Sequence, residues 1–398
     1  MLVVIISLIL ISGALSLLIT YFARRVGLRL GAFDTPGASG HIKTEIHQIP
    51  NTGGIAIYLG ITLPMIAGLV AVGLFPDRLP FSFADSLTVH LPGMRQRGGM
   101  IIALIACLTV LHIMGVIDDR RPLGAAVKLL IQIIVAAVMV IGFDSRLLTL
   151  LDNVVVHPYG WLLSSLLTIA WFIVVTNAIN FMDNMDGLAG GVAVIAGIIF
   201  LIAAILNQQW FIAMTLALLI GSATGFLVFN RPPASIFMGD GGSLVLGFLL
   251  AFLTVRTTYF GDPDIDGIAL GNNWYAVFMP LIILAVPLYD FTGVVLLRLS
   301  QGKNPMRGDE QHFSHRLVRL GMTKRSAVLI IYACTLATGI GGISLGKMPG
   351  WQAVLVFIQA ACILGVLAAI EFATGSVSGN RNTSNHCCNE KPAGDKQP

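Results

Sequence analysis

The stretch GLAGGVAVIAGIIFLIAAIL, residues 187–206, contains no charged side chain. Because about 20 apolar residues in a helix cross the hydrocarbon core of a bilayer, this stretch predicts a transmembrane helix. Directly before it lies NAINFMDNMD, residues 177–186, in which aspartates and asparagines follow another apolar run. The two stretches together predict a helical membrane protein whose polar residues gather at helix ends.

Apolar runs of this kind recur along the whole chain. Of its 398 residues 56% are hydrophobic and only 11% are charged, and the mean hydropathy is +0.85. This composition is typical of polytopic membrane proteins and excludes a large soluble domain. We expect an all-α fold with about eleven transmembrane helices, the eighth being the least certain because it is short. The runs are Leu2–Phe22, Gly53–Leu74, Met100–Val116, Ala125–Ile141, Tyr159–Thr176, Gly187–Leu206, Trp210–Val228, Leu244–Val255, Trp274–Leu297, Ala327–Leu345 and Trp351–Ile370.

The basic residues predict how these helices are oriented. With the amino terminus outside, 18 of the 24 lysines and arginines fall on the inner side. Positive charge is enriched in cytoplasmic loops, so this distribution places the acidic motifs in cytoplasmic catalytic loops. Residues 1–372 are predicted to form one multi-pass domain, and the polar segment 373–398 a disordered cytoplasmic tail.

The pair Asp118 and Asp119 stands at the end of an apolar run, in GVIDDRRPLG. Carboxylates near a membrane are costly and usually mark a function. Adjacent residues of a helix point about 100° apart, so the two groups are suited to different ligands. One could serve a metal ion and the other a proton or a phosphate. The alternative is an interfacial charge cluster neutralised by Arg120 and Arg121.

Four oxygen-bearing side chains follow at a spacing of three: Asn177, Asn180, Asp183 and Asp186. They would form a stripe on a helix or a ring in a loop. Amide and carboxylate oxygens suit Mg²⁺, which takes few protein ligands together with substrate phosphate. The alternative is that Asp186 caps the next helix.

Two further motifs favour phosphate or metal. FMGDGGS places Asp240 among glycines, as in an anion-binding turn or a metal site, and Phe237 beside it is either a stacking surface or a lipid-facing filler. GKNPMRGDEQHFSHRL, residues 302–317, is rich in basic and imidazole groups that bind phosphate. Its alternatives are a lipid-facing or topological role, or zinc bound by His312 and His315. A further acid, Asp290, lies in PLYDFTG.

In combination, the motifs resemble a known family. The order DD, NxxNxxDxxDGLAGG, NxxPAxIFMGDxGS and HxxHRL, from Asp34 to Arg316, is similar to the polyprenyl-phosphate N-acetylhexosamine-1-phosphate transferases of glycosyltransferase family 4. The ending His-Arg-Leu resembles the bacterial undecaprenyl-phosphate GlcNAc-1-phosphate transferase branch. The phospho-MurNAc-pentapeptide transferases of peptidoglycan synthesis are the second choice.

The resemblance implies a reaction. A UDP-N-acetylhexosamine, with UDP-GlcNAc as the first choice, would give its sugar 1-phosphate to undecaprenyl phosphate and release UMP, as the first lipid-linked step of cell-envelope polysaccharide synthesis. It also implies Mg²⁺ or Mn²⁺ as cofactor, placement in the bacterial inner membrane and no nucleic-acid partner, and it leaves a homodimer open.

The resemblance also implies roles for individual residues. Metal ligands would be Asn180 and Asp240. The catalytic set would be Asp118, Asp119, Asp183, His312 and His315. Substrate would be bound by His47, Lys128, Asn177, Asp186, Asn230, Phe237 and Arg316.

Three positions depart from the family pattern. Glu45 stands where a basic residue is usual, Asn184 replaces a glycine, and Ser314 replaces the central histidine of the last motif. Two other classes of membrane protein fit the sequence less well. An intramembrane aspartyl protease would need its YD element before GD, whereas Tyr289-Asp290 follows Gly239-Asp240. An ion-coupled transporter would place its acids near the bilayer midplane, whereas these acids lie at helix ends.

Overall fold

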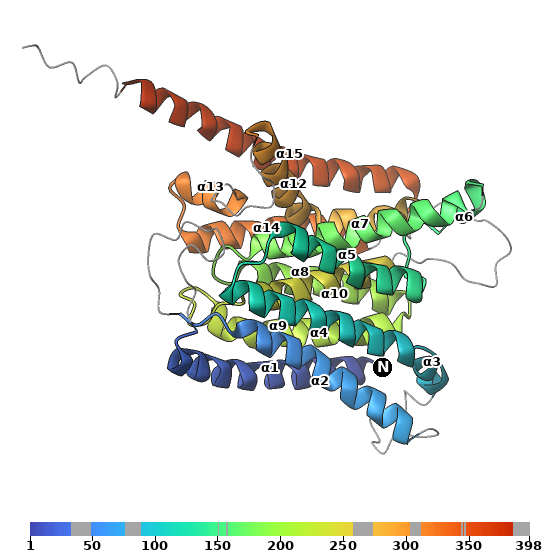
Figure 1. Ribbon diagram of the computed structural model, residues 1–398. Helices are drawn as coiled ribbons and strands as arrows, with labels where there is room; N and C mark the ends of the chain where they lie inside the picture. The colour runs from blue at the N-terminus through green and yellow to red at the C-terminus, as the bar shows by residue number, and fades with distance from the viewer. Residues whose placement is uncertain are drawn as a thin grey trace, which may run out of the picture.

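The computed structural model describes residues 1–32, 49–75, 89–149, 151–156, 158–257, 274–302, 312–343, 345 and 348–384, and most of these residues lie in helices (Figure 1). Ten helices within these residues are long and apolar enough to cross a membrane, which confirms the predicted all-α polytopic fold. The elements are α1 Leu2–Leu30, α2 Gly53–Leu74, α3 Leu91–Gln96, α4 Gly98–Arg120, α5 Ala125–Gly142, α6 Leu151–Val154, α7 Tyr159–Met182, α8 Leu188–Leu206, α9 Trp210–Asn230, α10 Asp240–Thr257, the 3₁₀ helix η2 Trp274–Phe278, α11 Met279–Ile283, α12 Ala285–Ser300, α13 Phe313–Arg319, α14 Lys324–Ile343 and α15 Gly350–Ser384.

Helix α10 forms the centre of the bundle. It packs against α2, α4, α7, α8 and α9, and 89% of its residues are buried. This explains why it was the least certain helix in the sequence. The mean hydropathy of α10 is only 1.3. A helix surrounded by protein can contain glycine, serine and threonine at positions where a lipid-facing helix would carry large apolar residues. It begins at Asp240 and is unbroken.

Small residues hold α1 against α2 and α9. The Ser12 hydroxyl donates to the Gly60 and Leu218 carbonyls, both at 2.8 Å, and a Cβ on Gly221 would lie 2.3 Å from the Ile9 carbonyl. Close backbone approach and serine hydrogen bonds are the usual contacts between membrane helices. The small residues near Ser12 therefore serve packing, and α1 is an integral part of the bundle.

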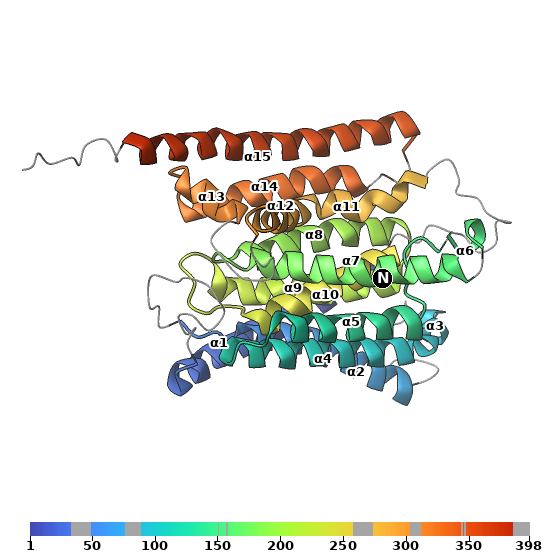
Figure 2. The same ribbon diagram turned by 45° about the horizontal axis from the view of Figure 1, so that its top comes forward.

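The ninth expected helix, Trp274–Leu297, is not continuous, and this prediction is wrong. The structure divides it into η2, α11 and α12, with the last break at Leu284. Pro287 lacks the N–H that would bond to the Ile283 carbonyl four residues earlier, which accounts for the break. Helix α12 then crosses its neighbours steeply in both views (Figures 1 and 2).

Helix α15 lies at the edge of the bundle in both views and continues to Ser384. The helix therefore extends beyond residue 372, where the tail was predicted to begin. Residues 385–398 lie outside the described part of the chain. Large apolar side chains stay exposed along α1, α5, α7 and α15, as expected for helices that face lipid.

Candidate active site

Charged groups from α4, α5 and α10 meet at one end of the bundle. The Lys128 ammonium lies 2.6 Å from the Asp118 carboxylate and 3.2 Å from that of Asp240. Asp118 also accepts a hydrogen bond from the Leu123 N–H at 2.7 Å and is only 3% exposed. Lys128 thus joins two predicted carboxylates that are far apart in the sequence. We call Asp118, Asp119, Lys128, Asn180 and Asp240 the acidic cluster.

Asp119 points away from Asp118, toward α10. Its carboxylate accepts the Asp240 N–H at 3.1 Å and a hydrogen bond from the Asn51 side chain. The first N–H groups of a helix have no partner within it and favour a negative charge nearby. The two aspartates therefore have different hydrogen-bond partners, and each one is held by another part of the fold. That they serve different ligands stays a prediction.

Asn180 completes the cluster from the end of α7. Its amide donates to Asp240 at 2.9 Å and to the Ser243 hydroxyl at 2.8 Å. Both Asp240 oxygens are therefore engaged, one by Asn180 and the other by Lys128. The side chain of Asp240 is nevertheless 25% exposed, so a ligand can reach it.

Backbone contacts fix the turn that carries Asp240. The N–H groups of Gly53 and Gly54 donate to the carbonyls of Phe237 and Met238, both at 2.9 Å, and the Phe237 N–H donates to the Pro50 carbonyl. On the other side, a Cβ on Gly115 would lie 2.4 Å from the Asp240 carbonyl carbon. The start of α10 is thus enclosed between α2 and α4, and the backbone of Phe237 takes part in this enclosure.

The Asn/Asp motif does not form one continuous stripe. Asn177 and Asn180 lie on α7, Asp183 directly follows this helix, and Asp186 lies in the turn before α8. Asn177 hydrogen-bonds to Gln132 of α5 at 2.7 Å. The Asp186 carboxylate accepts the Ala234 N–H at 2.9 Å.

Asn230 was predicted to bind substrate, but its position favours a structural role. It is 3% exposed, accepts the Gly187 N–H at 3.0 Å and donates to the Ile236 carbonyl at 2.9 Å. It therefore joins the turn before α8 to the turn before α10.

The last motif packs on α12. His312 is 2% exposed, and its Nδ1 lies 3.1 Å from the Asp290 carboxylate, which also accepts the Phe313 N–H at 2.7 Å. His312 therefore anchors the start of α13 rather than facing an open site. His315 and Arg316 lie half-buried on α13, and His47 lies outside the described residues.

Two departures from the family pattern contact each other. The Ser314 hydroxyl donates to the Asn184 side-chain oxygen at 2.6 Å, and the Asn184 amide donates to the Phe181 carbonyl. The pair links the last motif to the Asn/Asp motif. Residues this far apart in the chain could not have been paired from the sequence.

Sequence reasoning did not find Asn51 and His112. His112 is 9% exposed, stacks on Tyr58 and donates from Nδ1 to the Gly241 carbonyl at 2.8 Å. The sequence does point to His112, because an ionisable side chain inside an apolar membrane helix is costly and usually has a structural or functional role. Asn51 had no such signal, because it lies in a loop.

The acidic cluster suits a divalent cation. When all three carboxylates are ionised, the one ammonium leaves two negative charges uncompensated, and the donors are the hard oxygens that Mg²⁺ prefers. Next to Asp119, the Asn51 Oδ1 is buried and has no hydrogen-bond partner among the described residues. A Cβ on Gly239 would lie 2.4 Å from both this oxygen and Asp119 Oδ2, so the two oxygens converge there. The residues present therefore fit the metal that the resemblance implies.

Comparison with known proteins confirms the family resemblance. The model of glycosyl transferase family 4 matches residues 101–258, which contain the whole acidic cluster. A decaprenyl-phosphate N-acetylglucosaminephosphotransferase of Mycobacterium leprae is 31% identical over 90% of this chain and 89% of its own length. The chain belongs to glycosyl transferase family 4.

Two further relatives of this family 4 protein are similar over most of their length. The "Probable undecaprenyl-phosphate N-acetylglucosaminyl 1-phosphate transferase" of Bacillus subtilis is 29% identical over 89% of this chain and 88% of its own length. An undecaprenyl-phosphate alpha-N-acetylglucosaminyl 1-phosphate transferase of Escherichia coli K12 is 28% identical over 87% and 86%. The segment His312–Arg316 lies beyond the region that the family model matches.

Proposed function

We propose that this protein transfers N-acetylglucosamine 1-phosphate from UDP-GlcNAc to undecaprenyl phosphate and releases UMP. An oxygen of the lipid phosphate attacks the β-phosphorus of the UDP-sugar. The bond from this phosphorus to the oxygen that bridges to the α-phosphate breaks, and UMP leaves with that oxygen. One phosphoanhydride is exchanged for another, so the reaction is reversible.

The observation that carries this proposal is the acidic cluster at one end of the bundle. Two phosphate-bearing substrates must be brought together there, and catalysis of phosphoryl transfer consists mainly of positioning and charge stabilisation. Lys128 supplies a fixed ammonium for phosphate, already oriented by Asp118 and Asp240. The acids lie at helix ends, which favours a site for a lipid headgroup over a transporter site at the midplane.

Mg²⁺ held by Asp240 and Asn180, with Asp119 and Asn51 beside them, would neutralise charge on the diphosphate and on the leaving UMP. Asp118 or Asp119 orients the lipid phosphate, or takes its proton if it arrives protonated. His315 and Arg316 are proposed to contact phosphate, and Asp186 and Phe237 to contact uracil.

The sugar and the acceptor are proposed from the relatives. Those compared above are named as N-acetylglucosamine-phosphate transferases of undecaprenyl or decaprenyl phosphate, which favours GlcNAc over phospho-MurNAc-pentapeptide. For the same reason we propose that the protein lies in the bacterial plasma membrane. The distribution of basic residues supports a cytoplasmic site and an outside amino terminus.

The test is transfer by the purified protein in detergent with undecaprenyl phosphate and a panel of labelled UDP-sugars. We expect a lipid-linked GlcNAc diphosphate, release of UMP, no inorganic phosphate, and regeneration of UDP-GlcNAc when UMP is added to the product. A product reversed by UDP instead of UMP would mean that the sugar moved without its phosphate, and the proposal would then be wrong.

A further inference from the structure

The hydroxyl of Tyr332, on α14, reaches the turn before α8. It donates to the Gly187 carbonyl at 2.5 Å, and the same carbonyl accepts the Gly191 N–H at 2.9 Å. Gly191 also makes room for the tyrosine, because a Cβ there would overlap with the hydroxyl and the ring. Helix α14 packs against α8 and lies beside it in both views (Figures 1 and 2), so this contact belongs to an extended helix pair.

The Gly187 turn is held from two sides. Its φ of +77° lies in the left-handed region, which glycine adopts without strain. The Gly187 N–H donates to the Asn230 side chain of α9 at 3.0 Å, and the Gly187 carbonyl accepts the Tyr332 hydroxyl of α14. Glycine is the most flexible residue in the unfolded chain, so hydrogen bonds from neighbouring helices are needed to hold the peptide groups on both sides of it.

Asp186 precedes Gly187 directly and shares a peptide group with it. The Asp186 carboxylate accepts the Ala234 N–H at 2.9 Å, in the turn before α10. A second side chain of α14 supports that turn as well, because the Arg325 guanidinium donates to the Pro232 carbonyl at 3.2 Å. Helix α14 therefore contacts both turns that meet at Asp186.

We propose that Tyr332 is a positioning residue for the donor nucleotide. Its hydroxyl holds the Gly187 turn in the conformation that aims the Asp186 carboxylate at the uracil base, so it acts through the backbone rather than by touching the substrate. The proposal rests on the proposed function, in which Asp186 contacts uracil, and adds the group that places this carboxylate. A binding group must be held within about 0.5 Å of its productive position, which a glycine turn without such contacts would not provide.

The structure separates two contributions of Tyr332. Its ring fills the space left by Gly191 and packs α14 on α8, whereas its hydroxyl alone bonds to Gly187. Tyr332→Phe keeps the ring and removes the hydroxyl. The Gly187 carbonyl then still accepts the Gly191 N–H, so the fold should persist while the turn loses one constraint.

The first experiment measures the two KM values of Tyr332→Phe in the transfer assay. We expect the KM for UDP-GlcNAc to rise about fivefold, as for the loss of one hydrogen bond, and the KM for undecaprenyl phosphate to stay unchanged. Tyr159→Phe is the matched control and should change neither value, since Tyr159 is 65% exposed at the start of α7, at the opposite end from Asn180. Gly191→Ala, whose methyl group would displace the hydroxyl, should repeat the effect if Tyr332→Phe does not fold.

The second experiment distinguishes positioning from a general loosening of the protein. Uracil carries an N3–H that a carboxylate can accept, whereas N3 of cytosine is itself an acceptor, so UMP should inhibit transfer better than CMP. In Tyr332→Phe the ratio of the two inhibition constants should fall about fivefold, because the Asp186 contact serves UMP alone. A general loosening would weaken the binding of both nucleotides equally.

The proposal is overturned by an unchanged KM for UDP-GlcNAc in a folded variant, by an equal rise of both KM values, or by an undiminished preference for UMP. A wild-type protein that binds UMP and CMP equally would also overturn it, since Asp186 would then not distinguish the base. If the wild type forms no lipid product from UDP-GlcNAc, the proposed function fails instead, which separates the two failures.

Discussion

At the scale of single residues, Lys128 makes the acidic cluster possible. Two unit charges 4 Å apart interact by about 4 kcal/mol at the effective dielectric constant typical near a protein surface, so three close carboxylates would repel one another strongly. The ammonium contacts two of them, and the Asp240 N–H contacts the third. The remaining negative charge is what a divalent cation would neutralise.

This leads to a prediction about metal. Asp240→Asn removes one charge and one strong oxygen ligand, so we expect weaker Mn²⁺ binding, measured by electron paramagnetic resonance, and about 100-fold slower transfer or worse. Transfer by the wild type should stop in EDTA and return with Mg²⁺ or Mn²⁺. Asp144→Asn is the matched control, because that carboxylate is 69% exposed and lies near the opposite end of α5. Undiminished Mn²⁺ binding by Asp240→Asn would contradict the assignment.

A second prediction concerns Ser314 and Asn184. Because their side chains hydrogen-bond to each other, Ser314→Ala and Asn184→Ala should not be additive. A thermal and kinetic double-mutant cycle should give a coupling of about 1 kcal/mol. Ser300→Ala is the control, since that exposed hydroxyl donates to the Leu297 carbonyl within its own helix turn. Additive effects would show that the contact does not join the two motifs.

At the scale of helices, the start of α10 depends on close backbone approach from α4. Gly115→Ala would place a methyl group 2.4 Å from the Gly241 nitrogen, so α10 must shift and carry Asp240 with it. We expect a lower Tm and at least about tenfold slower transfer.

Gly98→Ala on the same helix is the control for this change. Among the described residues, nothing lies within 4 Å of a Cβ at that position, and alanine is the better helix former, so the stability of the protein should stay equal or rise by up to about 1 kcal/mol. Equal behaviour of the two variants would argue against the enclosure of α10 between α2 and α4.

At the scale of the whole molecule, orientation is open to direct test. In a protein without its native cysteines, a cysteine at the exposed position Ser300 should be protected from an impermeant thiol reagent in intact cells, while one at Gln96 should be labelled. Permeabilised cells, in which both should react, provide the control. Labelling of Ser300 from outside would place the acidic cluster on the wrong side for a cytoplasmic UDP-sugar.

The sequence alone determined the membrane class, most helix positions and the polar motifs at helix ends. Hydropathy and helix-ending residues are local properties of the sequence. Because the bilayer has a fixed thickness, these properties are enough to locate transmembrane helices. The predicted helix Trp274–Leu297 is wrong, because Pro287 interrupts it. The low hydropathy of α10 did not prevent a helix, because burial by protein relaxes the hydropathy that a helix needs.

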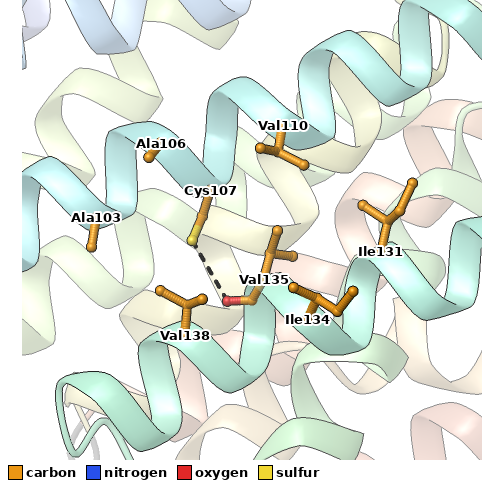
Figure 3. A pocket seen from close by; sticks show the side chains of 8 residues that line it. All are labelled: Ala103, Ala106, Cys107, Val110, Ile131, Ile134, Val135 and Val138. Carbon is orange, nitrogen blue, oxygen red and sulfur yellow. Dashed lines mark hydrogen bonds between the residues drawn. The ribbon is translucent and has the colours of Figure 1, made fainter.

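Only the tertiary structure decided which groups work together. The ion pair from Lys128 to Asp240 joins residues 112 positions apart, and no local pattern reports such a contact. The structure also turned Asn230 and His312 inward, brought Asn51 to Asp119, and left a groove where small residues of α4 face α5 (Figure 3). The physical reason is that the residue type alone fixes the chemistry of a side chain. The partners of that side chain, its burial and the space beside it depend on how all the helices pack.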